Sequence, residues 1–98
     1  MNQVKLEGKL THDATYRHTP AGDLIVSLDV RTPLGDGTEA SVPVEWFVPI
    51  TSPAPSLAPY HEGAPVRVEG YVRRRYSAMT GNTMAVTEVV TEEVERVY

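Results

Sequence analysis

The sequence predicts a small all-β barrel, and three observations support this fold class. Residues 65–76 alternate between an apolar and a polar face, and a period of two over this length is typical of a half-buried strand. The same alternation recurs in residues 2–10, 24–31 and 40–50, and residues 83–97 are rich in Val and Thr, which favour strands. Turn residues separate these segments at short spacing, and hardly any stretch has a helical period. Five strands joined this way favour a closed barrel with one core.

Each predicted strand is bounded by residues that favour turns. A short strand over residues 14–18 precedes a tight turn at 19–23, and residues 33–38 form a hairpin tip. Three prolines punctuate residues 51–63, which leaves room for at most one helical turn, around residues 56–60. Residues 77–82 are predicted to be a connecting loop.

Two features within the strands predict local irregularities. Gly70 lies in the middle of the apolar face of residues 65–76, where a glycine often marks a bend or a close backbone approach. Pro43 and Pro49 lack an amide donor, so strand 40–50 is expected to be an edge strand or to contain a bulge.

The length and composition predict one domain, residues 1–98, with a modest core. The chain has no cysteine, so neither a disulfide framework nor a thiolate metal site is expected. It contains no apolar run long enough for a membrane span and no signal-peptide pattern. We therefore expect a soluble cytoplasmic protein that does not engage membranes.

The charge is unevenly distributed along the chain. The net charge is −4, which argues against binding nucleic acid through a globally basic surface. However, residues 67–75 contain four arginines and one acid, whereas residues 88–98 contain four acids and one arginine. A local basic face is therefore compatible with the acidic total.

The polar face of residues 65–76 is the strongest candidate binding surface. Arginines that alternate with tyrosines on an exposed strand suit a single-stranded nucleic acid, because the cations contact phosphates and the rings stack on bases. The first-rank candidates are Arg67, Tyr71, Arg73, Arg74, Arg75 and Tyr76, and the second-rank candidates are Lys5, Lys9, Arg17 and Arg31. The alternative is that the arginines pair with acids of the last strand, such as Glu88 and Glu92.

Metal binding and catalysis find little support in the sequence. The three histidines, His12, His18 and His61, are scattered without ligand spacing, so no metal or other cofactor is expected. No nucleophile, phosphate-loop or paired-carboxylate motif is present, so the protein is not expected to be an enzyme. Asp13 and Asp23 flank turns and are expected to accept hydrogen bonds from nearby backbone amides.

An ordered set of motifs resembles the bacterial single-stranded DNA-binding protein (SSB) family. The motifs are NQVKLEGKL at residues 2–10 followed by Asp13, YRHTPAG at 16–22, Glu45-Trp46, Val68-Glu69-Gly70 within 63–75, and Thr87-Glu88-Val89-Val90. The resemblance implies an OB-fold, a five-stranded Greek-key barrel. It also implies a homo-oligomer, either a tetramer or a dimer, that binds single-stranded DNA without sequence preference in replication, recombination or repair.

The resemblance also implies roles for two aromatic residues. Trp46 occupies a position where the family stacks bases, and Tyr76 lies where the family often has another tryptophan. For Trp46 the alternative is core packing, which its shared parity with Val44 and Val48 favours unless a bulge reverses it. For Tyr71 the alternative is a subunit contact.

Three departures from the family pattern leave other functions open. The loop near residues 33–39 lacks an aromatic residue, prolines replace the usual helix after the third strand, and no linker or acidic tip follows Tyr98. The last feature, together with Trp46-Phe47-Val48-Pro49, resembles PriB, a short SSB relative of the replication-restart primosome. The alternatives are therefore a PriB-like primosome accessory protein, an accessory or phage-encoded paralogue, or a protein-interaction module whose DNA groove has degenerated. Replication or repair proteins are the expected protein partners.

Overall fold

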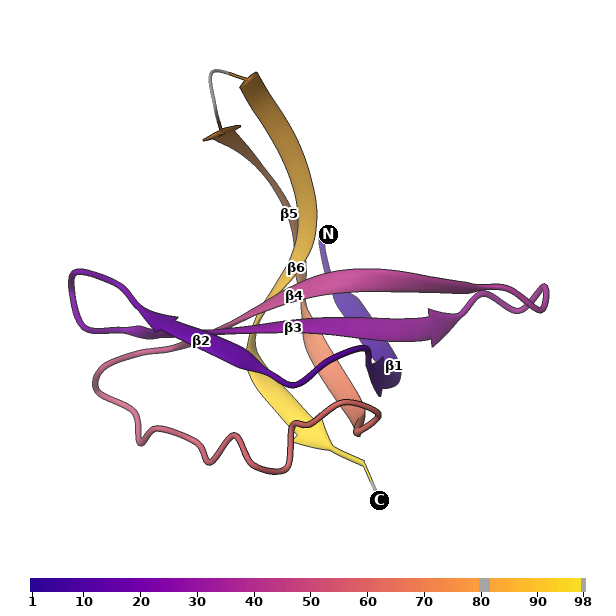
Figure 1. The fold of residues 1–98 in the computed structure, drawn as a ribbon, viewed down its shortest axis with the longest axis horizontal. Coiled ribbons are helices and arrows are strands. Elements are labelled where there is room, and N and C mark those ends of the chain that lie inside the picture. Colours follow the sequence, from indigo (N-terminus) through magenta and orange to yellow (C-terminus); the bar gives the residue numbers. More distant parts are fainter. Residues whose placement is uncertain (80–81, 98) are drawn as a thin grey trace.

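The computed structural model describes residues 1–79 and 82–97, and these residues form one closed sheet (Figure 1). The strands are β1 (Val4–Leu10), β2 (Thr15–His18), β3 (Leu24–Pro33), β4 (Glu39–Val48), β5 (Pro65–Met79) and β6 (Asn82–Arg96). The described residues contain no helix. The predicted all-β barrel is confirmed, and the short strand before the first turn adds β2 to the five main strands.

The sheet closes because β1 pairs with strands on both of its sides. The strand order is β1-β5-β6-β4-β3-β2, and a further pairing of β1 with β3 completes the ring. That pairing is short, with Lys9 opposite Arg31 and Leu10 opposite Val30. This pairing requires glycine at position 8, because glycine has no Cβ atom. Any other side chain would place a Cβ atom 2.1 Å from the Arg31 carbonyl oxygen. This is the Greek-key barrel of the OB-fold, as predicted.

Strands β5 and β6 extend beyond the barrel as a two-stranded arm, defined here as residues 71–79 and 82–88 (Figure 1). β5 pairs with β1 only as far as Gly70, whereas its ladder with β6 runs to Met79 opposite Asn82. The loop predicted at 77–82 is wrong for residues 77–79 and 82, which belong to β5 and β6, and residues 80–81 lie outside the described residues. The Asn2 side chain fixes the base of the arm, because its amide donates to the Val72 carbonyl (2.8 Å) and accepts from the Val72 amide (2.9 Å).

A β-bulge marks the point where the arm leaves the barrel. The ladder shifts between Glu69 and Gly70, which leaves Glu92 of β6 without a partner across the ladder. A Cβ atom at Gly70 would lie 2.0 Å from the Val90 carbonyl oxygen, so only glycine fits here without movement of the backbone. The buried Thr91 hydroxyl donates to the Glu69 carbonyl and accepts from the Glu93 amide (2.8 Å). The close approach predicted at Gly70 is confirmed.

The core fills the barrel with aliphatic side chains that alternate along the strands. It consists of Leu10, Val26, Leu28, Val30, Val44, Trp46, Val48, Ala64, Val66, Val68 and Val89. On β3 and β4 the even-numbered residues point inward and the odd-numbered ones outward. Pro43 lacks an amide donor, and β4 tolerates it because the pairing of β4 with β6 covers only Val44 to Trp46. The β6 side of the strand is therefore unpaired at Pro43.

Two aspartates fix the loops around the barrel. The Asp13 Oδ1 atom accepts from the Glu62 amide (2.7 Å), and the Asp23 Oδ1 atom accepts from the Ile50 amide (2.8 Å). The expectation of amides nearby in sequence was wrong, since the partners lie 49 and 27 residues away. The proline-rich segment has no helical turn at residues 56–60; a tight turn there has the Tyr60 amide donating to the Leu57 carbonyl (2.9 Å).

The hairpin tip between β3 and β4 is closed by Asp36. Its Oδ1 atom accepts hydrogen bonds from the hydroxyl and the amide of Thr38, and these two bonds lower the pKa of the Asp36 carboxyl. This tip lies at the opposite end of β3 and β4 from β2, away from the candidate site described below. No helix in residues 1–79 and 82–97 is long and apolar enough to cross a membrane.

Candidate nucleic-acid interface

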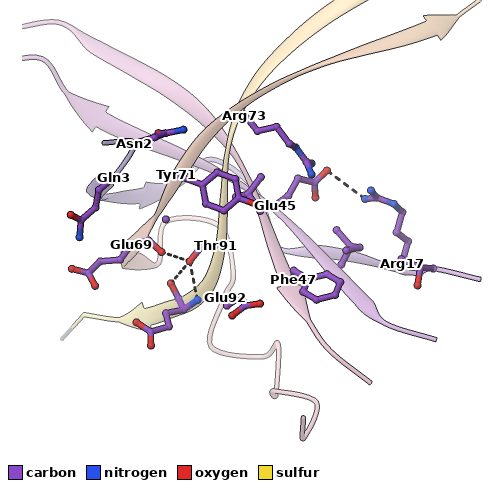
Figure 2. A pocket seen from close by; sticks show the side chains of 15 residues that line it. Asn2, Gln3, Arg17, Glu45, Phe47, Glu69, Tyr71, Arg73, Thr91 and Glu92 are labelled. Atoms are coloured by element: carbon purple, nitrogen blue, oxygen red, sulfur yellow. Dashed lines mark hydrogen bonds and ion pairs between the residues drawn. The ribbon is translucent and has the colours of Figure 1, made fainter. Parts of the chain in front are cut away.

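A groove of about 770 Å³ opens between the base of the arm and the outer face of the β2–β3–β4 sheet (Figure 2). One end is basic and aromatic, with Arg17, Phe47, Tyr71 and Arg73 in its lining. The other end is acidic, because Glu69, Glu92 and Glu93 line it. We refer to this cavity as the groove.

Two carboxylates beneath the basic end are buried. The side chain of Glu88 is only 2% exposed, and the oxygen Oε1 accepts from Arg73 Nη2 (2.8 Å) and from Arg75 Nε (2.6 Å). Arg73 lies directly opposite Glu88 in the β5–β6 ladder, so the register of the arm creates this contact. Such charge-assisted hydrogen bonds are stronger than neutral ones.

The second buried carboxylate belongs to β4. Glu45 Oε2 accepts from the Ser27 hydroxyl at 2.9 Å, since the two residues lie opposite each other on β3 and β4. Glu45 Oε1 lies 3.5 Å from Arg17 Nη1 and 3.9 Å from Arg75 Nη2. Figure 2 shows Arg17 and Arg73 approaching Glu45 from opposite sides of the groove.

These five side chains, Arg17, Glu45, Arg73, Arg75 and Glu88, form one network that we call the Arg–Glu cluster. Three guanidinium groups and two carboxylates leave one net positive charge in the cluster. The arginine side chains remain 59%, 43% and 42% exposed in the order Arg17, Arg73 and Arg75. Because a guanidinium has five N–H donors and each here uses only one or two, donors remain for an anion in the groove.

The two tyrosines of the arm are exposed on opposite faces of β5. Tyr71 is 46% exposed and lines the groove together with Arg73. Tyr76 is 68% exposed and shares the other face with Arg74, whose Cζ atom lies 5.6 Å from the centroid of the Tyr76 ring. Within the described residues, no carboxylate pairs with Arg74. The arm thus offers a ring and a cation on each face.

Trp46 lies in the core, which corrects its expected role as a stacking platform. Its side chain is 7% exposed, and its ring packs edge-to-face on Tyr60 with the centroids 5.4 Å apart. The ladder between β3 and β4 has no register shift. No bulge therefore turns Trp46 away from the face that it shares with Val44 and Val48. With 7% of its side chain exposed, the indole offers little ring surface to a base.

The remaining predicted residues lie outside the groove. Arg67 pairs with Glu7 (3.0 Å) and Glu95 (3.8 Å), and Lys5 pairs with Glu69 (3.4 Å). These are exposed pairs of the kind that contribute little to stability. Lys9 is exposed opposite Arg31, which itself pairs with Glu39 at 3.2 Å.

The alternative predicted for the arginines, pairing with acids of the last strand, therefore holds for Arg73 and Arg75 through Glu88. Arg67 likewise pairs with an acid of the last strand, Glu95. Arg74 is the exception. The paired arginines are half-exposed rather than sealed, so they remain available at the protein surface.

Sequence reasoning missed several residues of the site. It did not identify Glu45 as a buried anchor, nor Phe47 and Ile25 as part of the groove lining. The shared parity of Glu45 and Phe47 placed both on one face of the strand, but only the cross-strand register shows what faces them. The described residues contain no group of three or more His, Cys, Asp or Glu side chains placed to hold a metal ion.

The fold and the groove define a class of protein, an OB-fold barrel with arginine, aromatic and glutamate side chains along an outer groove. No protein-family model matches the chain. Curated relatives do match: the chain is 35% identical to "Single-stranded DNA-binding protein 3" of Listeria innocua over 97% of its own length and 62% of the relative's. It is 34% identical to "Single-stranded DNA-binding protein 2" of Listeria monocytogenes and 30% identical to "Single-stranded DNA-binding protein" of Oceanobacillus iheyensis, with the same coverage.

The predicted resemblance to the single-stranded DNA-binding protein family is confirmed by these matches, which run along nearly the whole chain. The chain spans less than two thirds of the length of these relatives.

Proposed function

We propose that this protein binds single-stranded DNA without sequence preference and serves in replication, recombination or repair. The observation that carries the proposal is its similarity, over 97% of the chain, to proteins named single-stranded DNA-binding protein. The structure supports it with a site of suitable chemistry. The protein would act by binding alone, with no bond made or broken.

The proposed path of the DNA follows the basic end of the groove and the arm. Phosphates would contact the outer N–H groups of Arg17 and Arg73 in the groove, and bases would stack on Tyr71. Arg75 lies outside the groove lining but shares Glu88 with Arg73, and it would contact the next phosphate. The acidic end of the groove repels phosphate, so the strand would turn toward the arm. There Arg74 and Tyr76 offer a cation and a ring beside each other.

Arg67, Lys5 and Lys9 are proposed as outer contacts, since they lie on the barrel beyond the groove. Their exposed ion pairs can exchange a carboxylate for a phosphate at little cost, because such pairs are weak in water. Trp46 is not part of the proposed surface.

The test is a titration of fluorescently labelled oligo-dT at low and at high salt. We expect micromolar or tighter binding at low salt that weakens as salt rises, because bound cations are released from the phosphates. A matched oligo-dC or mixed-sequence strand should bind comparably. Absence of binding at low salt would refute the proposal.

A second candidate function is a protein-interaction module that has kept the barrel but lost its DNA affinity. The observations that favour it are the net charge of −4 and the internal pairing of Arg73 and Arg75. Replacing Arg73, Arg74 and Arg75 together with alanine separates the two functions, since only a DNA-binding protein loses oligonucleotide affinity. A PriB-like role in replication restart is a version of the DNA-binding function with an added protein partner.

Assembly and location follow from the same proposal. We propose a homo-oligomer, either a tetramer or a dimer, associated with the nucleoid. In the described residues β1 pairs with β3 only at Lys9 and Leu10, so the same edge from Val4 to Gly8 is free to pair with a second copy. Light scattering of the purified protein distinguishes the two oligomers.

A further inference from the structure

We propose that Glu45 and Glu88 are positioning residues of the DNA site: they hold Arg17, Arg73 and Arg75 in the orientation that receives phosphates. This inference rests on the proposed single-stranded DNA binding and assigns a role to two acidic residues within a site for an anion. Simple charge repulsion would predict the opposite, that both carboxylates weaken DNA binding.

The geometry favours positioning over repulsion. Glu88 is buried beneath the arginines, and one oxygen receives N–H groups from both Arg73 and Arg75. The guanidinium groups therefore lie above the carboxylate and neutralise it on the side from which DNA would approach. Glu45 forms a longer ion pair with the third arginine, Arg17, at 3.5 Å, and the Ser27 hydroxyl donates to the other Glu45 oxygen.

The cost of ordering an arginine explains why such anchors matter. A free arginine side chain loses considerable rotamer freedom when it is fixed on a phosphate, and its planar fork binds well only when correctly oriented. In the Arg–Glu cluster this ordering takes place on folding, before DNA arrives. Preorganisation of this kind raises affinity because less freedom is lost on binding.

The acidic end of the groove supplies a matched comparison. Glu92 also lines the groove and lies on the same strand as Glu88, but it is exposed and makes no ion pair within the described residues. Its charge should act by repulsion alone. The two glutamates are thus predicted to have opposite effects on DNA binding.

The experiment compares E88Q and E92Q in oligo-dT titrations over a series of salt concentrations, with folding checked by circular dichroism. We expect E88Q to bind about tenfold more weakly, because two ordered charge-assisted contacts are lost. The slope of log K against log salt should fall by about 1.4, since each phosphate contact on a single strand contributes roughly 0.7. E92Q should bind about 1.5- to 5-fold more tightly, the range expected for a surface charge.

A second variant, R75K, keeps the charge but cannot reproduce the contact of the guanidinium fork with Glu88 and Glu45, and it should also bind more weakly. It keeps the proposal testable if E88Q does not fold. Equal or tighter binding by E88Q, weaker binding with an unchanged salt slope, or unchanged binding by R75K would overturn the positioning role. Failure of the wild-type protein to bind oligo-dT would instead refute the proposed function itself.

Discussion

Replacing Tyr76 with alanine tests the arm as a DNA-binding surface. The side chain is 68% exposed, and its ring contact in the described residues is with Arg74, 5.6 Å from the ring centroid. Its removal therefore exposes no core and breaks no ion pair. We expect the thermal stability of Y76A to equal that of the wild type, apart from the loss of a cation–π contact worth about 0.5–1 kcal/mol at exposed sites.

The expected effect on DNA binding is much larger. Stacking of one base on an aromatic ring is worth about 1–3 kcal/mol, which corresponds to a loss of affinity of roughly 5- to 150-fold. The conservative variant Y76F retains the ring and should bind within about twofold of the wild type, because stacking uses the ring face rather than the hydroxyl.

The assay is fluorescence anisotropy with labelled oligo-dT, combined with a thermal melt of each variant. Tyr16 provides the matched control, since it is 63% exposed but lies on β2, on the strand face opposite to that of the groove-lining Arg17. Y16A should leave affinity unchanged. Equal affinities for Y76A and Y16A would show that the arm does not stack bases.

Three other predictions follow from the same geometry. W46L should lower the free energy of unfolding in urea by about 1–3 kcal/mol through lost core packing while leaving the DNA affinity of the folded protein unchanged; a selective loss of affinity would restore a stacking role for Trp46. G70A should lower stability by about 2–3 kcal/mol in a thermal melt, because its Cβ atom would lie 2.0 Å from the Val90 carbonyl oxygen; a wild-type melting temperature would contradict the bulge geometry. R74A should reduce the salt slope of oligo-dT binding by about 0.7 without changing stability, whereas an unchanged slope would remove Arg74 from the phosphate contacts.

The strands and the core could be predicted because alternation is a local property of the chain. The parity of Val66 and Val68, and of Val44 and Trp46, decides which side chains enter the barrel before any strand has a partner. The same parity placed Trp46 inside. The family resemblance suggested a stacking role for this residue, and the local pattern proved the better guide.

The cross-strand contacts could not be predicted, because they depend on register. Arg73 meets Glu88 only because the bulge at Gly70 shifts the β5–β6 ladder by one residue. The burial of Glu45 similarly requires β2, β4 and the arm to converge on one point. Asp13 and Asp23 bind amides distant in sequence, which rules for local turns do not anticipate.

The length of the arm could not be predicted from the alternation of residues either. Alternation predicts the strand as far as Tyr76, and the turn preference of Gly81 and Asn82 predicts a loop after it. In the structure the ladder extends to Met79, since Ser77 and Ala78 find partners on β6. Pairing with a neighbouring strand can hold residues in a β-strand even when their intrinsic β-propensity is weak.

Photocross-linking with oligo-dT that contains 5-iododeoxyuridine tests the central claim most directly, because this base couples to aromatic side chains on which it stacks. After digestion and mass spectrometry, we expect adducts on Tyr71 and Tyr76, on the two faces of the arm. Adducts confined to Tyr16, or none on the arm despite tight binding, would contradict the proposed path of the DNA.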